Sequence, residues 1–331
     1  MMQLGLIGIG AGAAAALLFA SVTSGSWLSI ILFYLAPLPI MIAGIGWSHW
    51  AALTAALTAA LALGLVFGTV FFFAFLAGAG IPAWWLGYLA MLARPAAATG
   101  GHGPNGGSAA ALEWYPPGRL VVWAAVLATL IVVVAIPNFG TDAESFRAGL
   151  HQALSRMLRI ETGAPAGAPL TVPGVNNAER LIDFMVAAIP AAAAVLATIT
   201  NTFNLWLSAR IVKFSGLLKR PWPQLSAMTF PPLAAAALAI AMGLSFLGGL
   251  IGIVAGVLSA SLLMAFGVLG FAVLHAITQG INSRGFLLGG VYAAVIVFGW
   301  PVLVLCLLGL VEIALNIRAR VARKRGPPAV N

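Results

Sequence analysis

Long apolar runs dominate this chain, and short clusters of glycine, proline and polar residues separate them. A run of about 20 apolar residues can cross the hydrocarbon core of a bilayer as a helix. Turn-forming residues divide the runs into about ten helices. The expected helices are 4–23, 27–46, 50–76, 81–94, 119–138, 179–212, 230–247, 250–278, 285–299 and 301–318. The pattern therefore predicts an all-α, polytopic transmembrane helix bundle of about ten helices, with a range of eight to ten.

Two places in this pattern allow alternatives. Residues 81–94 form a short run that begins with aromatic residues typical of a membrane interface, so this segment either spans the membrane or re-enters it. Residues 285–318 as one helix would be about 45 Å long at 1.5 Å per residue, which exceeds a hydrocarbon core of about 30 Å. The Gly299-Trp300-Pro301 turn favours two short helices there.

Charge predicts the orientation of the bundle. With the N-terminus inside and ten crossings, twelve of the 16 lysines and arginines fall on the inner side. Only Arg147, Arg156, Arg159 and Arg180 fall outside, as the positive-inside rule requires. Both termini are therefore expected inside, and the predicted location is the inner (cytoplasmic) membrane of a bacterium.

Composition supports a membrane protein with little soluble mass. The 331 residues are 62% hydrophobic and 7% charged, whereas soluble domains are about 25% charged. The net charge of +9 is spread over short loops and the tail, so it does not indicate a nucleic-acid partner. The lone Cys306 lies in an apolar run and is expected to be a packing residue.

The polar insertions divide the chain into six expected parts. They are an N-terminal four-helix membrane block (1–94), a flexible cytoplasmic loop (95–118), a fifth helix (119–138), an extracytoplasmic amphipathic helix with a linker (139–178), a C-terminal membrane block (179–318) and a basic cytoplasmic tail (319–331).

The amphipathic helix is expected at Asp142–Thr162, capped by Thr141. Its apolar residues recur at helical spacing, which favours a helix that lies on the outer membrane surface or covers the bundle. His151 on the polar side is expected to be solvated. The apolar set is Phe146, Leu150, Leu154, Met157 and Leu158.

No catalytic motif is present in the sequence. There is no phosphate-binding loop, dinucleotide fingerprint, HExxH or CxxC, so neither a cofactor nor a metal site is predicted. An intramembrane enzyme would have to use Glu312 and His275 as its acid and base.

Small residues recur at four-residue intervals along one face of the first helix, at Gly8, Gly12, Ala16 and Ala20. Small side chains let helices approach closely in lipid. Packing within the chain is the favoured interpretation, and a face for another membrane protein is the alternative.

The second helix carries Pro37 and Pro39 in mid-membrane. Each proline removes a backbone donor and breaks or kinks the helix. Transporters use broken helices to bind solutes and ions, whereas a kink can also merely shape the bundle, and the sequence leaves both interpretations open.

Polar residues within the apolar segments form three sets. Asn201, Asn204 and Ser208 share a face in the stretch Glu179–Arg220, which begins with charges and ends in a basic run. The second set has helical spacing near the inner end of 250–278 and consists of His275, Thr278, Gln279 and Asn282. The third set lies at the end of the last helix and consists of Glu312, Asn316 and Arg320.

Each of these polar sets has a structural and a functional interpretation. For the asparagines and the serine, hydrogen bonds between helices are favoured over contact with a ligand. Glu312 should face the bundle or the inner interface, paired with Arg284 or a tail arginine. Asn201 and Asn204 are expected at the depth of His275 and Gln279, so the sequence predicts one inward-facing polar site.

Several motifs resemble a known family. They are YLAPLPIMIAG after the small-residue first helix, and NTFNLWLSARIV, RPWPQL, FLGGLIG, GFAVLHAITQG, VYAAVIVFGWP and LGLVEIALNIRAR in the second half. They resemble the YybS-like group of bacterial membrane proteins, domain-of-unknown-function family 2232. The resemblance covers most of both membrane blocks and little of 95–178.

The first half of that family is similar in layout to the substrate-binding S components of energy-coupling-factor transporters. The resemblance implies a solute-binding or transport-related component without its own ATPase, with a small-molecule solute and the lipid bilayer as partners. The alternative function is a structural or assembly factor that binds another membrane protein.

Overall fold

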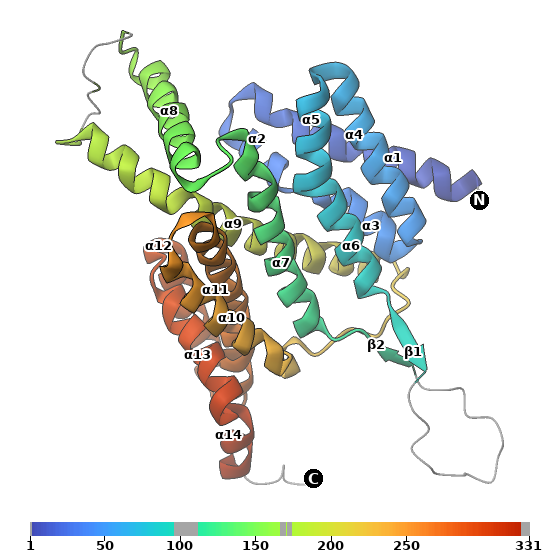
Figure 1. The fold of residues 1–331 in the computed structure, drawn as a ribbon. Helices are drawn as coiled ribbons and strands as arrows, with labels where there is room; N and C mark the ends of the chain where they lie inside the picture. Colours follow the sequence, from blue (N-terminus) through green and yellow to red (C-terminus); the bar gives the residue numbers. More distant parts are fainter. Residues whose placement is uncertain (1, 96–111, 166–169, 171–173, 326–331) are drawn as a thin grey trace. The chain divides into compact units, whose positions relative to one another are not determined.

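The computed structural model describes residues 2–95, 112–165, 170 and 174–325. Within them the chain is almost entirely helical, and its only sheet has two short strands (Figure 1). The helices are α1 (Met2–Ala20), α2 (Trp27–Tyr34), α3 (Pro37–Gly46), α4 (His49–Phe67), α5 (Thr69–Phe75), α6 (Ile81–Ala90), α7 (Pro117–Ala135), α8 (Ala143–Thr162), α9 (Ala178–Phe214), α10 (Pro232–Leu244), α11 (Gly249–Ile277), α12 (Arg284–Phe298), α13 (Pro301–Leu315) and α14 (Ile317–Arg325). The strands are β1 (Ala93–Pro95) and β2 (Leu112–Trp114).

The all-α, polytopic fold is confirmed. Among the described residues, seven helices are long and apolar enough to cross a membrane, and the bent pair α13–α14 makes an eighth candidate. Two shorter apolar segments, Pro232–Leu247 and Arg284–Phe298, match the remaining predicted helices. The inside position of both termini stays a prediction.

The predicted boundary between the third and fourth helices is wrong. The third helix ends at Phe67 rather than at residue 76, because Gly68 adopts a φ of 94° that only glycine adopts easily. The fourth candidate span then runs from Thr69 to Ala90, over 22 residues, so it has the length of a full crossing and is not a short segment.

Pro82 lies inside this fourth candidate span. A proline inside an α-helix clashes with the carbonyl four residues earlier. The chain avoids a break through a π-helical turn at Leu76–Gly80, in which the Ile81 N–H donates to the Leu76 carbonyl. The helical path therefore continues past this proline into α6.

The chain forms two compact units. The first comprises Met1–Ala124, Thr200–Phe230 and Ala272–Thr278, and the second comprises Ala125–Ile199, Pro231–Phe271 and Gln279–Asn331. Helices α9 and α11 each contribute residues to both units.

In the first unit, α1 packs along α4 through glycines. A Cβ on Gly8 would lie 2.7 Å from Thr54 Cβ, and one on Gly12 would lie 2.6 Å from the Ala55 carbonyl oxygen. Both distances are shorter than van der Waals contact, so only glycine fits at either position. This face of α1, which includes the buried Ala16, is covered by α4 within the chain.

The strands β1 and β2 form an antiparallel pair that joins α6 to α7 (Figure 1). Arg94 lies opposite Glu113, and its guanidinium donates to the carboxylate at 2.8 Å. This bond keeps the pKa of Glu113 below its ordinary value. The two strands flank residues 96–111 of the predicted cytoplasmic loop, which lie outside the described residues.

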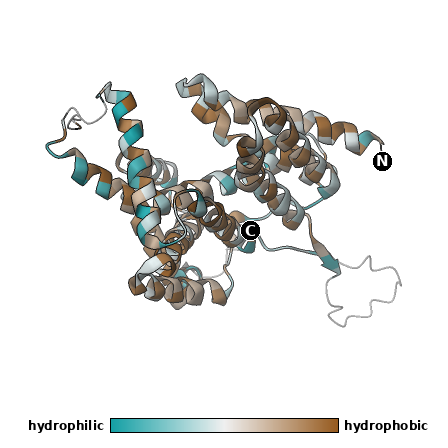
Figure 2. Cartoon of the chain, turned by 45° about the horizontal axis from the view of Figure 1, so that its top comes forward, coloured by the Kyte–Doolittle hydropathy of each residue, from teal (hydrophilic) through white to brown (hydrophobic). Residues whose placement is uncertain are grey.

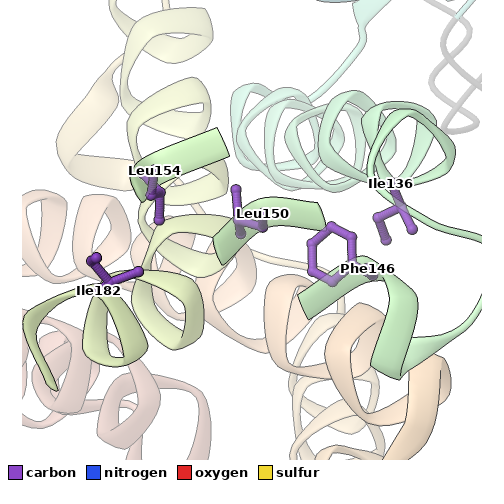
Figure 3. Packing of buried hydrophobic residues seen from close by; sticks show 5 residues of the cluster. All are labelled: Ile136, Phe146, Leu150, Leu154 and Ile182. Atoms are coloured by element: carbon purple, nitrogen blue, oxygen red, sulfur yellow. The ribbon is translucent and has the colours of Figure 1, made fainter. Parts of the chain in front are cut away.

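In the second unit, α8 is the predicted amphipathic helix, and its polar residues stand out in the hydropathy colouring (Figure 2). Its Phe146, Leu150 and Leu154 pack with Ile136 and Ile182 in one apolar cluster (Figure 3). Leu158 packs at the edge of this cluster. The predicted apolar face is thus present except at Met157, whose exposed fraction is 59%.

The polar side of α8 contacts α9. His151 Nε2 lies 3.3 Å from Glu179 Oε2 and 3.8 Å from Asp183 Oδ1, so it is not merely solvated as the sequence suggested. The pairing depends on the packing of two helices that are separated by a Pro/Gly-rich linker, and no local pattern indicates it.

The predicted cap of α8 is off by one residue. Asp142, not Thr141, is the N-cap: its carboxylate accepts from the backbone N–H groups of Glu144 and Ser145, both at 2.9 Å. The Asp142 backbone N–H in turn donates to Ser145 Oγ at 3.2 Å, which completes a capping box.

The glycine contacts predict the cost of enlarging one face of α1. Gly12→Val should destabilise the protein by about 1–3 kcal/mol, because the new side chain overlaps the α4 backbone. Thermal unfolding in detergent measures the change. Gly10→Val is the matched control, since a Cβ on Gly10 meets nothing within 4 Å. Equal losses of stability in the two variants would contradict this packing.

The cap predicts a pH dependence for α8. Hydrogen bonds from Ser145 hold the pKa of Asp142 below its ordinary value. A carboxylate with a lowered folded pKa stabilises above its unfolded pKa, and this contribution is lost as the pH falls through the folded value. Asp142→Ala should therefore speed amide hydrogen exchange in the first turn of α8 at neutral pH, and much less at acid pH below the folded pKa.

Glu144→Ala is the control for this experiment, because Glu144 lies in the same turn and its side chain makes no cap bond. If Glu144→Ala speeds exchange as much as Asp142→Ala does, the capping role of Asp142 is wrong.

Candidate functional site

The second candidate span is broken between α2 and α3, as Pro37 and Pro39 predicted. In a continuous helix the Leu38 N–H would donate to the Tyr34 carbonyl. Here it donates to the Leu35 carbonyl at 3.0 Å. The Tyr34 carbonyl is thereby left without a donor from the next turn, inside a segment that is apolar enough to span the membrane.

Asn204 of α9 supplies the missing donor. Its Nδ2 donates to the Tyr34 oxygen at 2.8 Å and to the Thr200 oxygen of its own helix at 2.9 Å. Since both partners are carbonyl oxygens, only the NH₂ group can face them, and this fixes the orientation of the amide. The Asn204 side chain is fully buried.

The rest of this α9 face continues along α3. Ser208 is buried and donates to the Leu205 carbonyl of its own helix at 2.9 Å. One turn further, Val212 lies 3.6 Å from the position of a Cβ on Gly46, at the end of α3. This face of α9 therefore follows α3 from the helix break to its last residue.

Two amide groups on this face keep an atom without a partner. Asn204 Oδ1 and Asn201 Nδ2 are both buried, and neither has a hydrogen-bond partner within the described chain. An unsatisfied buried polar group costs about 1–3 kcal/mol. Asn201 and Asn204 are three residues apart and therefore lie on one face of α9. This face thus presents an acceptor, Asn204 Oδ1, and a donor, Asn201 Nδ2.

The basic end of the stretch Glu179–Arg220 packs within the first unit. The charged groups of Arg210 and Lys213 lie 5.5 Å and 4.8 Å from the centre of the Trp222 ring. Arg220 donates to the Ala90 carbonyl at the end of α6, at 3.0 Å. A cation there complements the negative end of a helix dipole. Partial burial lowers the pKa of Arg220 from its ordinary value.

The second polar set does not lie on one helical face. Helix α11 ends at Ile277, and Gly280 takes a φ of 79°, which ends the helical path. Gln279 and Asn282 follow the helix and are exposed, whereas His275 is half-buried in its last turn. The predicted grouping of His275 and Gln279 with the asparagines stays a prediction.

The third set contains a buried ion pair in the second unit. Glu312 is 5% exposed, and its carboxylate accepts from the Arg318 backbone N–H at 3.1 Å and from Arg318 Nε at 2.8 Å. Its partner is thus one of the tail arginines.

The last predicted helix is shorter than expected. It ends at Leu315 instead of residue 318, because Asn316 adopts a left-handed φ of 47°. Asparagine tolerates this region better than most residues do. Glu312 and Arg320 are therefore not on one continuous helix.

Among the described residues, no group of three or more His, Cys, Asp and Glu side chains could hold a metal ion. In the second unit, a cavity of about 530 Å³ between α10 and α11 is lined by apolar residues alone. Such a cavity suits an acyl chain better than a polar solute.

Comparison with known proteins places the chain in one family. The family model described as "Predicted membrane protein (DUF2232)" matches residues 13–313. No curated protein and no solved structure gave a significant match.

The bonds of Asn204 predict the effect of its replacement. Asn204→Leu should cost about 1–3 kcal/mol of stability, because the Tyr34 carbonyl becomes a buried acceptor without a donor. Asn204→Asp should be at least as harmful, since a carboxylate cannot donate to either carbonyl. Thermal unfolding in detergent measures both. Ser208→Ala is the control on the same face, and if it costs as much as Asn204→Leu, the capping role fails.

Proposed function

We propose that this chain, which belongs to the predicted membrane protein family DUF2232, is a solute-binding component of a membrane transport system without its own ATPase. The observation that supports it is the pair of free amide atoms at the helix break, Asn201 Nδ2 and Asn204 Oδ1. Buried polar atoms of native proteins nearly always have a partner, so these two favour a bound polar molecule.

The arrangement favours a neutral solute with a donor and an acceptor close together. Asn204 Oδ1 accepts and Asn201 Nδ2 donates, which matches the edge of an amide or of a nucleobase. Helix breaks near the middle of a span are sites where transporters bind their substrates. The two prolines provide the break, and Asn204 both caps it and presents its remaining oxygen.

The energy for transport would come from outside this chain. Its sequence has no phosphate-binding loop, so an ion gradient or a partner subunit has to drive the solute. We place the protein in the inner membrane of a bacterium, on the basis of the positive-inside charge pattern and the resemblance to a bacterial family.

The alternative function is an assembly factor that docks through the first helix or through the basic inner loops, and docking through the first helix has less support. The small-residue face of α1 already packs against α4, with Gly8 and Gly12 in direct contact. A partner would have to use the outer face of α1, where Leu6 and Leu17 are exposed to lipid as in any spanning helix.

A ligand screen tests the solute-binding proposal. The purified full chain should gain thermal stability with one member of a panel of vitamins, nucleobases and amino acids, because a ligand at about 100 times its Kd adds about 2.7 kcal/mol. Asn201→Ala should abolish this gain. In the absence of ligand, Asn201→Ala should be neutral or slightly stabilising, because it removes an unpaired buried group.

Ser208→Ala, whose hydroxyl bonds only within its own helix, should keep the full response. A screen with no stabilising or copurified compound would argue against solute binding. A ligand response that survives Asn201→Ala would place the site elsewhere.

A further inference from the structure

The last described helix turns away from the span before it. The axes of α13 and α14 differ by 75° across Asn316, and α13 is apolar whereas α14 is IRARVARKR. A helix so bent and so basic does not continue through hydrocarbon. If α13 crosses the membrane, α14 runs close to the plane of the surface where α13 emerges.

The buried ion pair of Glu312 holds this bend. One carboxylate oxygen accepts from the Arg318 backbone N–H in the first turn of α14, and the other accepts from the Arg318 side chain. A carboxylate at a helix N-terminus is favoured by the exposed N–H groups and by the helix dipole. Glu312 of α13 thus fixes the start of α14 and neutralises Arg318.

Three other cations on α14 remain without an acidic partner. Arg320, Arg323 and Lys324 have i, i+3, i+4 spacing and therefore share one face of the helix. All three are exposed, whereas Ile317 and Val321 are half-buried. Among the described residues no carboxylate forms an ion pair with them. Their one side-chain hydrogen bond there is a long one, from Arg323 Nε to the Ala319 carbonyl within the helix.

We propose that this basic face, Arg320, Arg323 and Lys324, binds the headgroups of anionic lipids. The helix begins one residue after the apolar helix α13 and extends about 12–14 Å at 1.5 Å per residue. If α13 lies in the membrane, the whole face therefore stays at the headgroup level. Juxtamembrane basic clusters attract anionic lipids in this way. The positive face, the bend and the short distance from the span together favour a lipid over an acidic protein partner.

The test compares lipids on the full chain in detergent micelles. Phosphatidylglycerol and phosphatidylcholine are titrated separately, and bound lipids are counted by native mass spectrometry. The wild-type chain should prefer phosphatidylglycerol. The variant R320Q/R323Q/K324Q should lose about 100-fold in phosphatidylglycerol affinity, since each cation near an anionic surface is worth about a fivefold change. Its affinity for phosphatidylcholine should not change.

A matched control removes the same charge elsewhere. The variant R147Q/R156Q/R180Q replaces three exposed arginines on α8 and at the start of α9, and it should keep the preference for phosphatidylglycerol. Free glycerol phosphate should not compete with the lipid. The proposal is overturned if the α14 variant keeps the preference, if the control loses as much, or if glycerol phosphate competes as well as the lipid does.

The bend is tested through Glu312. In Glu312→Gln the bond to the Arg318 guanidinium weakens, and phosphatidylglycerol affinity should fall several-fold while the gel-filtration profile stays that of the wild type. Wild-type lipid affinity in a folded Glu312→Gln chain would show that the bend does not position the face. If Glu312→Gln does not fold, the exposed α14 substitutions still decide the proposal.

Discussion

A backbone carbonyl inside an apolar span has to find a donor within the protein, because hydrocarbon offers none. The break between α2 and α3 creates this problem at Tyr34, and Asn204 solves it with a side-chain amide from a helix 170 residues away in sequence. That one bond ties the broken helix to α9. It also sets which atom of the amide, Oδ1, is left without a hydrogen-bond partner.

The same constraint explains the other irregular points of the chain. Pro82 is accommodated by a π-helical turn in which the Ile81 N–H reaches the Leu76 carbonyl, so the helix continues. At Asn316 the helix does end, and Glu312 provides acceptors for the first turn of α14. In each case a group within the protein makes a hydrogen bond in place of one that a regular helix would have made.

Several polar residues in the apolar helices form hydrogen bonds that hold the fold together. Ser208 is satisfied within its own turn, and Glu312 is satisfied by Arg318. Asn201 and Asn204 differ because each retains a buried atom without a partner.

The sequence by itself determined the class of the protein, most of its helices and the α2–α3 break, because the length of apolar runs and the chemistry of proline act locally. It also placed Asn201, Asn204 and Ser208 on one face, since helical spacing alone decides that. Only the tertiary structure decided that Asn204 meets the Tyr34 carbonyl and that Gly12 meets α4. Those contacts join segments far apart in sequence, and no local pattern encodes which surfaces meet.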